Sequence, residues 1–413
     1  MKVYKKEGDV VQIVSFPNEK VEKGSYLLIE DPTVDKGLLV QVIDVQFANV
    51  PGVFEDILRD AVMGEEMDGE SYDPMELSSQ ISLLKDTKLL VCRIRGILSN
   101  GEVTTGMSYL PSRSSSRITP YKIENLINSM VGGRPFQLGQ TREGSKLILD
   151  VKSLDGKLNI ITGKKGTGKS HLSKLLVLSL VRYGAPCVIL DVNGEYVNLN
   201  KKRAGKPVDF GKFVTLTPKL NMRFTLPKAG LRPVLNMMIY ALELPSASAR
   251  VFAKIWRELE RRGSLSLASL GEAIAKWDCH ESVRDALYAR YNAIVESGMF
   301  TDRVEESLNL EFLMKGVSKG GAAIINLKDQ TSMVRRMIVE LLLNKLTELL
   351  SAWKLRAVFL FAEEAHLYLR ETYWDDIVTR MRHLGMFTTF ITNQPDTIQE
   401  SIYRQADNIF LFN

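Results

Sequence analysis

Cysteine is scarce in this sequence: its 413 residues include only Cys92, Cys187 and Cys279. These three are far apart and odd in number, which excludes a disulfide framework and argues against a zinc site. Such sparse use of cysteine is typical of a reducing compartment, so we expect a cytoplasmic protein.

Long apolar runs are also missing. No stretch approaches the ~20 apolar residues that span a bilayer, and residues 1–7 (MKVYKKE) lack the apolar centre of a signal peptide. We therefore expect no membrane partner. The net charge is small as well. A value of +5 over this length permits a polyanionic partner without demanding one. Hydrophobic residues at 45% and charged residues at 25% indicate an ordinary globular protein, and roughly 150 residues per domain predicts two or three domains.

The first part of the chain alternates short apolar runs with turn residues, a pattern that predicts a small β-barrel. An acidic, glycine-interrupted segment near residues 52–80 is expected to be a solvated excursion from this barrel, with an acidic docking surface as the less favoured alternative. The polar run 111–117 has no apolar periodicity and marks a linker, so we assign residues 1–115 to the barrel domain. The expected strands are residues 10–16, 26–29, 38–47, 89–97 and 103–109.

From Lys157 onward, apolar runs alternate with amphipathic segments, which predicts parallel strands joined by crossover helices. A block with apolar residues at helical spacing interrupts this pattern between Arg232 and Phe300. We therefore predict an α/β fold with an inserted helical bundle. The nucleotide-binding core is assigned to residues 116–231 and 306–413, and the bundle to residues 232–305.

Residues 163–170 (GKKGTGKS) form a complete phosphate-binding loop, or P-loop, between an apolar strand and an amphipathic helix. Its glycines let backbone N–H groups wrap the phosphates. Lys169 reaches the outer phosphates, and the Ser170 hydroxyl is offered to Mg²⁺. The motif predicts ATP and Mg²⁺ as ligands. The residues expected to bind them are Gly163, Lys165, Gly166, Thr167, Gly168, Lys169, Ser170 and His171.

Paired carboxylates follow a second apolar run in residues 358–364 (VFLFAEE), where a P-loop protein needs its acidic partner site, the Walker B motif. Glu363 is expected to help hold the metal. Its side chain is one methylene longer than the usual Asp, which leaves room for a bridging water. Glu364 is expected to act as the general base toward the attacking water. His366 has no second His or Cys at ligand spacing, so it either orients the acids or is a plain surface histidine.

Two further strand ends carry polar groups. The apolar run Cys187–Asp191 delivers Asp191, and an Asn-Gly turn brings Glu195 to the same edge. Asn393 follows the strand expected at residues 387–391, where the ligands of parallel sheets bind. We expect Asn393 to sense the nucleotide, with a plain turn as the alternative.

In combination, these motifs resemble the HerA branch of the HerA–FtsK ATPases. The resemblance implies a RecA-like core, an N-terminal HAS barrel and an inserted set of helices. It also implies a homohexameric ring that pumps double-stranded DNA, often with a NurA-type nuclease partner in DNA end processing. The residues that carry it are 163–170, 191–196, 363–366 and 392–395.

In rings of this family a basic residue from the neighbouring subunit completes the nucleotide site. Lys157 occupies the position where HerA proteins tend to have an Arg, and a Lys cannot bridge phosphate oxygens as a planar guanidinium does. Arg382 is the better candidate for this role or for a role in its own site, and Arg380 is the weaker one. The family usually has Gln and Arg where this chain has Asn393 and Gln394. HerA proteins also continue past the strand on which this sequence ends.

The sequence indicates little about contacts to DNA, because a translocating ring needs only a few loop residues that bind phosphates. The basic cluster Lys201, Lys202, Arg203 and Lys206 is a candidate, and a solvated hairpin is the favoured alternative. Two other functions stay open. One is a DNA pump encoded by a plasmid or virus, and the other is an ATP-gated scaffold that regulates a partner enzyme without moving on DNA.

Overall fold

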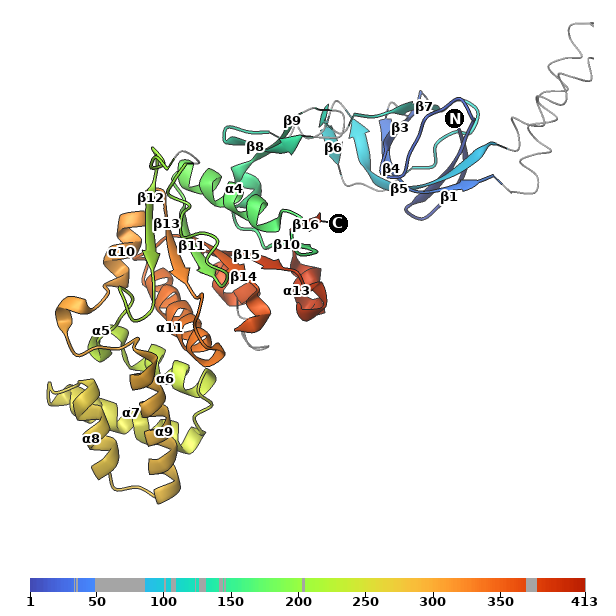
Figure 1. The fold of residues 1–413 in the computed structure, drawn as a ribbon. Helices are drawn as coiled ribbons and strands as arrows, with labels where there is room; N and C mark the ends of the chain where they lie inside the picture. Colours follow the sequence, from blue (N-terminus) through green and yellow to red (C-terminus); the bar gives the residue numbers. More distant parts are fainter. Residues whose placement is uncertain are drawn as a thin grey trace, which may run out of the picture. The chain divides into compact units, whose positions relative to one another are not determined.

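Two large sheets organise the chain, one in each of two compact units (Figure 1). The first unit comprises residues 1–131 and 139–149, and the second comprises residues 132–138 and 150–413. A computed structural model describes residues 1–32, 34, 36–48, 86–99, 102–104, 109–122, 124–125, 131–140, 144, 146–202, 205–368 and 377–412. The acidic segment near residues 52–80 lies outside these residues.

The first unit is an antiparallel sheet in the order β1-β2-β5-β4-β3-β7, with β6 paired to β5. Its long strands β4 and β5 pair with register shifts at two points, and such bulges bend a sheet around its core. Inward side chains alternate along the strands, as in Val11 and Ile13 or Leu38 and Val40. The strands are β1 (Lys2–Glu7), β2 (Val10–Ser15), β3 (Tyr26–Asp31), β4 (Lys36–Phe47), β5 (Lys88–Ser99), β6 (Glu102–Thr104) and β7 (Arg117–Pro120).

The boundary between the units falls later than the linker expected at residues 111–117. Strand β7 begins at Arg117 and pairs with β3, and the backbone N–H of Ser112 donates to the Asp31 carboxylate. These contacts hold the polar run on the first sheet, so the predicted division at residue 115 differs from the structure. Strands β8 (Pro135–Gln140) and β9 (Lys146–Asp150) form a separate two-stranded sheet.

The second unit contains a parallel sheet in the order β12-β13-β11-β14-β15-β10-β16. Its central strands are buried along almost their whole length, as expected for a parallel sheet covered on both faces. The strands are β10 (Asn159–Gly163), β11 (Pro186–Asp191), β12 (Lys212–Leu216), β13 (Gly321–Asn326), β14 (Val358–Glu363), β15 (Met386–Thr392) and β16 (Asn408–Phe412).

Two crossover helices cover opposite faces of this sheet. Helix α4 (Lys169–Arg182) joins β10 to β11, and α11 (Ser332–Ser351) joins β13 to β14, so the two connections run in opposite directions along the strand order. Because such crossovers are right-handed, opposite directions place the helices on opposite faces. Apolar side chains occupy nearly every side of α11, which marks it as a central, buried helix.

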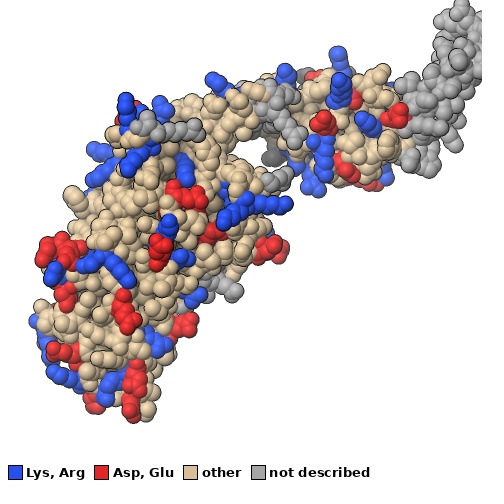
Figure 2. Space-filling view, viewed as in Figure 1, with Lys and Arg blue, Asp and Glu red and all other residues tan. Residues whose placement is uncertain are grey.

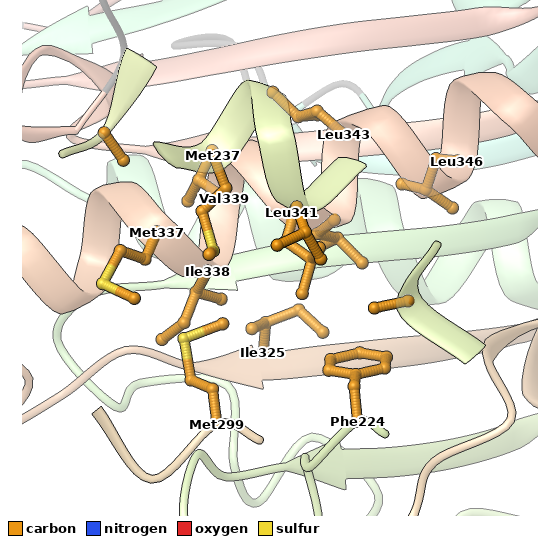
Figure 3. Close-up of a cluster of buried hydrophobic side chains, with 14 of the residues drawn as sticks. Phe224, Met237, Met299, Ile325, Met337, Ile338, Val339, Leu341, Leu343 and Leu346 are labelled. Atoms are coloured by element: carbon orange, nitrogen blue, oxygen red, sulfur yellow. The ribbon is translucent and has the colours of Figure 1, made fainter. Parts of the chain in front are cut away.

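The helical block packs against the outer side of α11. Helix α6 contacts α11, and Met237 of α6 joins Met337, Ile338 and Leu341 of α11 in one apolar cluster (Figure 3). The two ends of the block meet where the backbones of Phe224 and Thr301 bond. This confirms the predicted helical insertion. Its helices are α5 (Leu226–Ala229), α6 (Leu231–Tyr240), α7 (Ser246–Arg261), α8 (Leu267–Lys276) and α9 (Glu281–Ser297). Helix α10 (Leu310–Val317) follows the block and contacts the parallel sheet.

None of the helices within the described ranges is both long enough and apolar enough to cross a membrane.

Candidate nucleotide site

The P-loop joins the end of β10 to the start of α4. Gly163, Gly166 and Gly168 have φ values of 149°, 83° and 110°, which residues other than glycine rarely adopt. A Cβ on Gly163 would collide with the carbonyl oxygen of Phe412, because β16 runs directly beside β10. A Cβ on Gly166 would meet no atom within 4 Å. The loop therefore closes tightly at its base and opens at its tip.

Lys169 points back into this loop. Its side chain is 8% exposed, and the Nζ atom donates to the carbonyl oxygens of Gly163 and Lys164 at 2.7 and 2.6 Å. Thr167 closes the same turn by donating its hydroxyl to the Lys164 carbonyl at 2.8 Å. The ammonium is thus held at the mouth of the loop, in reach of a phosphate.

The first turn of α4 supplies free backbone donors to the same place. Its cap residue, Gly168, has no side chain to accept those N–H groups, so the helix N-terminus is open to an anion. Ser170 and His171 lie in this first turn, and Lys165 is exposed on the loop. The structure therefore brings all of the predicted phosphate-binding residues together.

Two buried carboxylates lie at the ends of neighbouring strands. Asp191 ends β11 and is fully buried, and Glu363 ends β14 and is 2% exposed. The Asp191 carboxylate accepts the backbone N–H groups of Glu195 and Tyr196, each at 2.9 Å. Burial raises the pKa of Glu363 to about 7, and the negative charges of Asp191 and Glu195 act in the same direction. At this end of the sheet, the negative charge of the carboxylates is not fully balanced by positive charge around them.

The Glu363 environment fits a divalent cation. Its Oε2 atom is buried without a hydrogen-bond partner among the described residues, and a cation would relieve both that desolvation and the repulsion from Asp191. Within the described part of the chain, no three His, Cys, Asp or Glu side chains form a metal cage. Mg²⁺ suits such a site, because it keeps several waters and is bound by few carboxylates together with substrate phosphates.

Glu364 lies beside the next strand of the sheet. Its backbone is in the left-handed conformation, with φ of 46°, and its N–H donates to the carbonyl of Ile391 at 2.7 Å. The carboxylate accepts the Thr392 hydroxyl at 3.3 Å and the Asn393 N–H at 3.4 Å. A strained backbone of this kind persists only where its surroundings enforce it, as at many active sites.

Asn393 and His366 flank this carboxylate. Asn393 follows β15, which lies between β14 and the P-loop strand β10. The Nδ1 atom of His366 lies 3.7 Å from the Glu364 Oε2 atom, and its side chain is 16% exposed. That position agrees with the reading in which His366 orients the acids rather than with an open surface position.

Glu195 is more exposed than the two buried acids Asp191 and Glu363. Its carboxylate contacts Lys174 of α4 at 3.4 Å and is 41% exposed. The same lysine stands over the Tyr196 ring at 5.4 Å, and the Tyr196 hydroxyl donates to Ser173 at 2.9 Å. These contacts fasten the loop after β11 to the P-loop helix.

Lys157 and Arg382 occupy the opposite edge of the sheet. Lys157 precedes β10 by two residues, so it lies roughly 20 Å from the P-loop of its own chain, at about 3.3 Å per strand residue. Both basic groups pair with Asp407, at 3.2 Å for Lys157 and 2.9 Å for Arg382. The structure therefore brings Lys157 and Arg382 together but keeps them away from Lys169 and Glu364.

Of the remaining basic candidates, the structure describes Arg380, Lys201, Lys202 and Lys206, and it places these four away from the nucleotide site. Arg380 lines a surface cavity with residues of α11. Lys201 and Lys202 belong to a short hairpin in which Lys202 pairs with Asp209 at 3.2 Å, and Lys206 is exposed beside them. Arg203 lies outside the described residues. Over the helical insertion, acidic and basic side chains are interspersed on the face drawn in Figure 2.

Two residues that shape the site have no sequence signal. Tyr368 is buried and donates its hydroxyl to the Glu363 carbonyl at 2.8 Å. Asp407 is a single acid outside every motif. Only the packing of the strands shows that these two side chains meet the predicted ones.

A family model described as helicase HerA, central domain, matches residues 136–346, about half of the chain. The chain has no significant match among functionally characterised sequences. The matched segment runs from β8 into α11 and includes the whole P-loop.

Solved structures align with this chain at low identity. The bacterial conjugative coupling protein TrwB aligns with a TM-score of 0.50 and 15% identity, over 69% of this chain and 73% of that one. VirB4 of Thermoanaerobacter pseudethanolicus aligns with a TM-score of 0.45 and 15% identity, over 68% of this chain and 85% of that one. With a P-loop and buried acids on one edge of a parallel sheet, and a family match over half its length, this chain belongs to the HerA family of P-loop ATPases.

Proposed function

We propose that this chain is an ATP-driven motor of the HerA type that moves double-stranded DNA. It would act in the cytoplasm as a homohexameric ring, with a NurA-type nuclease in DNA end processing. The observation that carries the proposal is that the candidate catalytic residues lie at two opposite edges of the sheet. The P-loop and the acids occupy one edge, and the basic pair Lys157 and Arg382 occupies the other.

This division favours an assembly in which two neighbouring copies of the chain together form each nucleotide site. Lys157 cannot reach its own P-loop across the length of β10. A second copy that docks its basic edge onto the P-loop edge would place a cation at the outer phosphates. A head-to-tail contact of this kind builds a ring when its rotation closes. Asp407 would then hold both basic groups in position.

Within one copy, each group has a role that follows from its position. The P-loop N–H groups and Lys169 bind the phosphates, while Ser170, Glu363 and Asp191 lie where Mg²⁺ would be held. Mg²⁺ neutralises phosphate charge when bound. Glu364 accepts a proton from the attacking water, and Asn393, held beside it, reports the state of the outer phosphate to the strand β15.

ATP hydrolysis with and without linear duplex DNA tests the proposal. A motor that moves on DNA hydrolyses ATP faster when duplex is present, and the stimulation weakens as salt rises because phosphate contacts release counterions. The same rate with and without duplex, at both low and moderate salt, would instead favour the ATP-gated scaffold.

Two substitutions separate binding from turnover in that assay. Lys169→Ala is expected to abolish ATP binding, because it removes the cation at the mouth of the P-loop. Glu364→Gln is expected to bind ATP with normal affinity and to lose turnover by roughly 10²-fold or more, as for a lost general base. Vigorous hydrolysis by Glu364→Gln would contradict the assignment of the base.

A further inference from the structure

Trp353 stands exposed just beyond the end of helix α11. Its side chain is 83% exposed, the highest value among the large apolar side chains that the structure describes. Tryptophan is among the residues that contribute most to protein–protein contacts. We propose that Trp353 is the apolar anchor by which the basic edge of one copy docks onto the P-loop edge of a second copy. The inference rests on the proposed function and names the contact that joins the two halves of a shared site.

The backbone at Trp353 has a conformation that suits glycine. Its φ of 57° is left-handed. The Trp353 N–H donates to the Leu350 carbonyl at 3.0 Å, and the Lys354 N–H donates to the Leu349 carbonyl at 2.9 Å. These two bonds define a Schellman motif, in which the position of Trp353 is usually glycine. Since an exposed ring gains little packing in return, Trp353 lowers the stability of the single chain, as residues at functional sites often do.

Trp353 lies on the same edge of the sheet as Lys157 and Arg382. It belongs to the connection between α11 and β14, so it lies at the end of the sheet where the strands begin. Val358 starts β14, and its N–H donates to the Gly385 carbonyl at 2.9 Å, which sets this connection beside the segment that carries Arg382. A contact that brings the two basic groups to a neighbour therefore brings Trp353 with them.

The P-loop edge has exposed apolar side chains that could receive the ring. Met333 and Leu367 are each 41% exposed. Met333 lies in the first turn of α11, and Leu367 follows Glu364 beyond β14, so both lie where the strands end. Trp353 is at the other end of the 20-residue helix, roughly 30 Å from Met333. Only a head-to-tail neighbour can bring the ring to these side chains, and the Met333 thioether suits an aromatic contact.

Charge favours the same pairing of edges. The edge around Trp353 carries Lys157, Arg382 and the exposed side chain of Arg356. The opposite edge carries the buried acids, and a bound nucleotide adds its phosphates there. Opposite charges steer two surfaces together, and like charges disfavour the wrong pairing. The partner that fits the basic edge is therefore the P-loop edge of a second copy and not another basic edge.

Sedimentation of the full chain with Mg²⁺ and a non-hydrolysable ATP analogue tests the anchor. Trp353→Gly is expected to raise the protein concentration at half-assembly by at least about tenfold, as for the loss of an aromatic hot spot. Trp353→Phe keeps an aromatic ring and should raise it less. At a concentration where the wild type is monomeric, Trp353→Gly should melt roughly 2 °C higher, because glycine suits the Schellman position. A residue that served only the fold would lose stability instead.

ATP hydrolysis supplies a second readout. Trp353→Gly should bind ATP normally, because each copy keeps its own P-loop, but it should hydrolyse ATP slowly at concentrations where the wild type is assembled. Raising the protein concentration by about tenfold or more should restore turnover by mass action. Tyr288→Ala is the matched control. Tyr288 is an aromatic side chain of helix α9 that is 45% exposed, and its removal should change neither assembly nor turnover.

The outcomes separate the anchor from the proposed function. Unchanged assembly of Trp353→Gly, or an equal loss in Tyr288→Ala, would overturn the anchor and leave the motor proposal standing. A wild type that stays monomeric with the ATP analogue and duplex DNA would overturn the shared sites of the proposed function and the anchor with them.

Discussion

At the scale of single residues, the glycines of the P-loop have different reasons to be glycine. Gly163 is packed against the backbone of β16, whereas Gly166 stands in open space. Both have positive φ, so a side chain strains either of them, but only Gly163 also excludes a Cβ by contact.

This difference predicts unequal effects on stability. Gly163→Ala must displace β16 and is expected to lower the free energy of unfolding by roughly 3 kcal/mol. Gly166→Ala pays only for its backbone conformation, about 1 kcal/mol. Thermal melts of the nucleotide-free protein check this, and equal losses in the two variants would mean that β16 does not press on the loop.

For Glu364, the sequence predicts the position of the acid but not its backbone conformation. Its place after an apolar run predicts a catalytic acid, and the structure holds it beside Asn393 as expected. The left-handed backbone that aims it is invisible in the sequence, because that conformation is favoured by glycine rather than glutamate. It arises from the bond between its N–H and β15, a contact that only the assembled sheet provides.

At the scale of elements, Asp407 joins three segments of the second unit. Its carboxylate accepts the Leu158 N–H at the start of β10 and pairs with Lys157 and with Arg382. Partial burial opposes its ionisation, but the Leu158 N–H, Lys157 and Arg382 hold its pKa below the usual range.

Asp407→Asn is expected to lower stability at pH 7 by about 1 kcal/mol, allowing for screening by solvent. A lowered pKa in the folded state adds stability above the unfolded value of 3.8, and that stability is lost as pH falls through the folded pKa. The difference in melting temperature between variant and wild type should therefore shrink below pH 3.8. Asp209→Asn, which removes an exposed pair with Lys202, is the control and should change stability less. A difference that grows on acidification would contradict this account.

Most elements of the second unit could be predicted because apolar runs and helical spacing are local signals. Such signals coincide with the strands 186–191, 321–326 and 358–363 and with the helix 332–351. Strand β12 was not predicted, since Lys212–Leu216 is short and half-buried at the sheet edge. No strand is predicted at residues 117–120, where the linker expected at residues 111–117 ends, because only the pairing of β7 with β3 reveals it.

At the scale of the whole molecule, the candidate residues of the nucleotide site are divided between two opposite edges of the parallel sheet. The P-loop and Glu364 lie at the carboxyl edge of the parallel sheet, and Lys157 and Arg382 lie at the amino edge of the same strands. Sequence order conceals this, because Lys157 is only six residues before Gly163. An extended strand separates them by roughly 20 Å.

Mixed assemblies test whether copies share sites. Glu364→Gln lacks the base, and the double variant Lys157→Ala with Arg382→Ala lacks the basic edge, so each alone is expected to hydrolyse ATP poorly. When the two are co-expressed in equal amounts, about a quarter of the contacts pair an intact P-loop edge with an intact basic edge, and DNA-stimulated hydrolysis should return to that extent. Mixing Glu364→Gln with Lys169→Ala restores nothing, because both defects lie at the same edge and no contact is complete. If the first mixture also stays inactive, or if the double variant alone is fully active, Lys157 and Arg382 do not complete a neighbour's site.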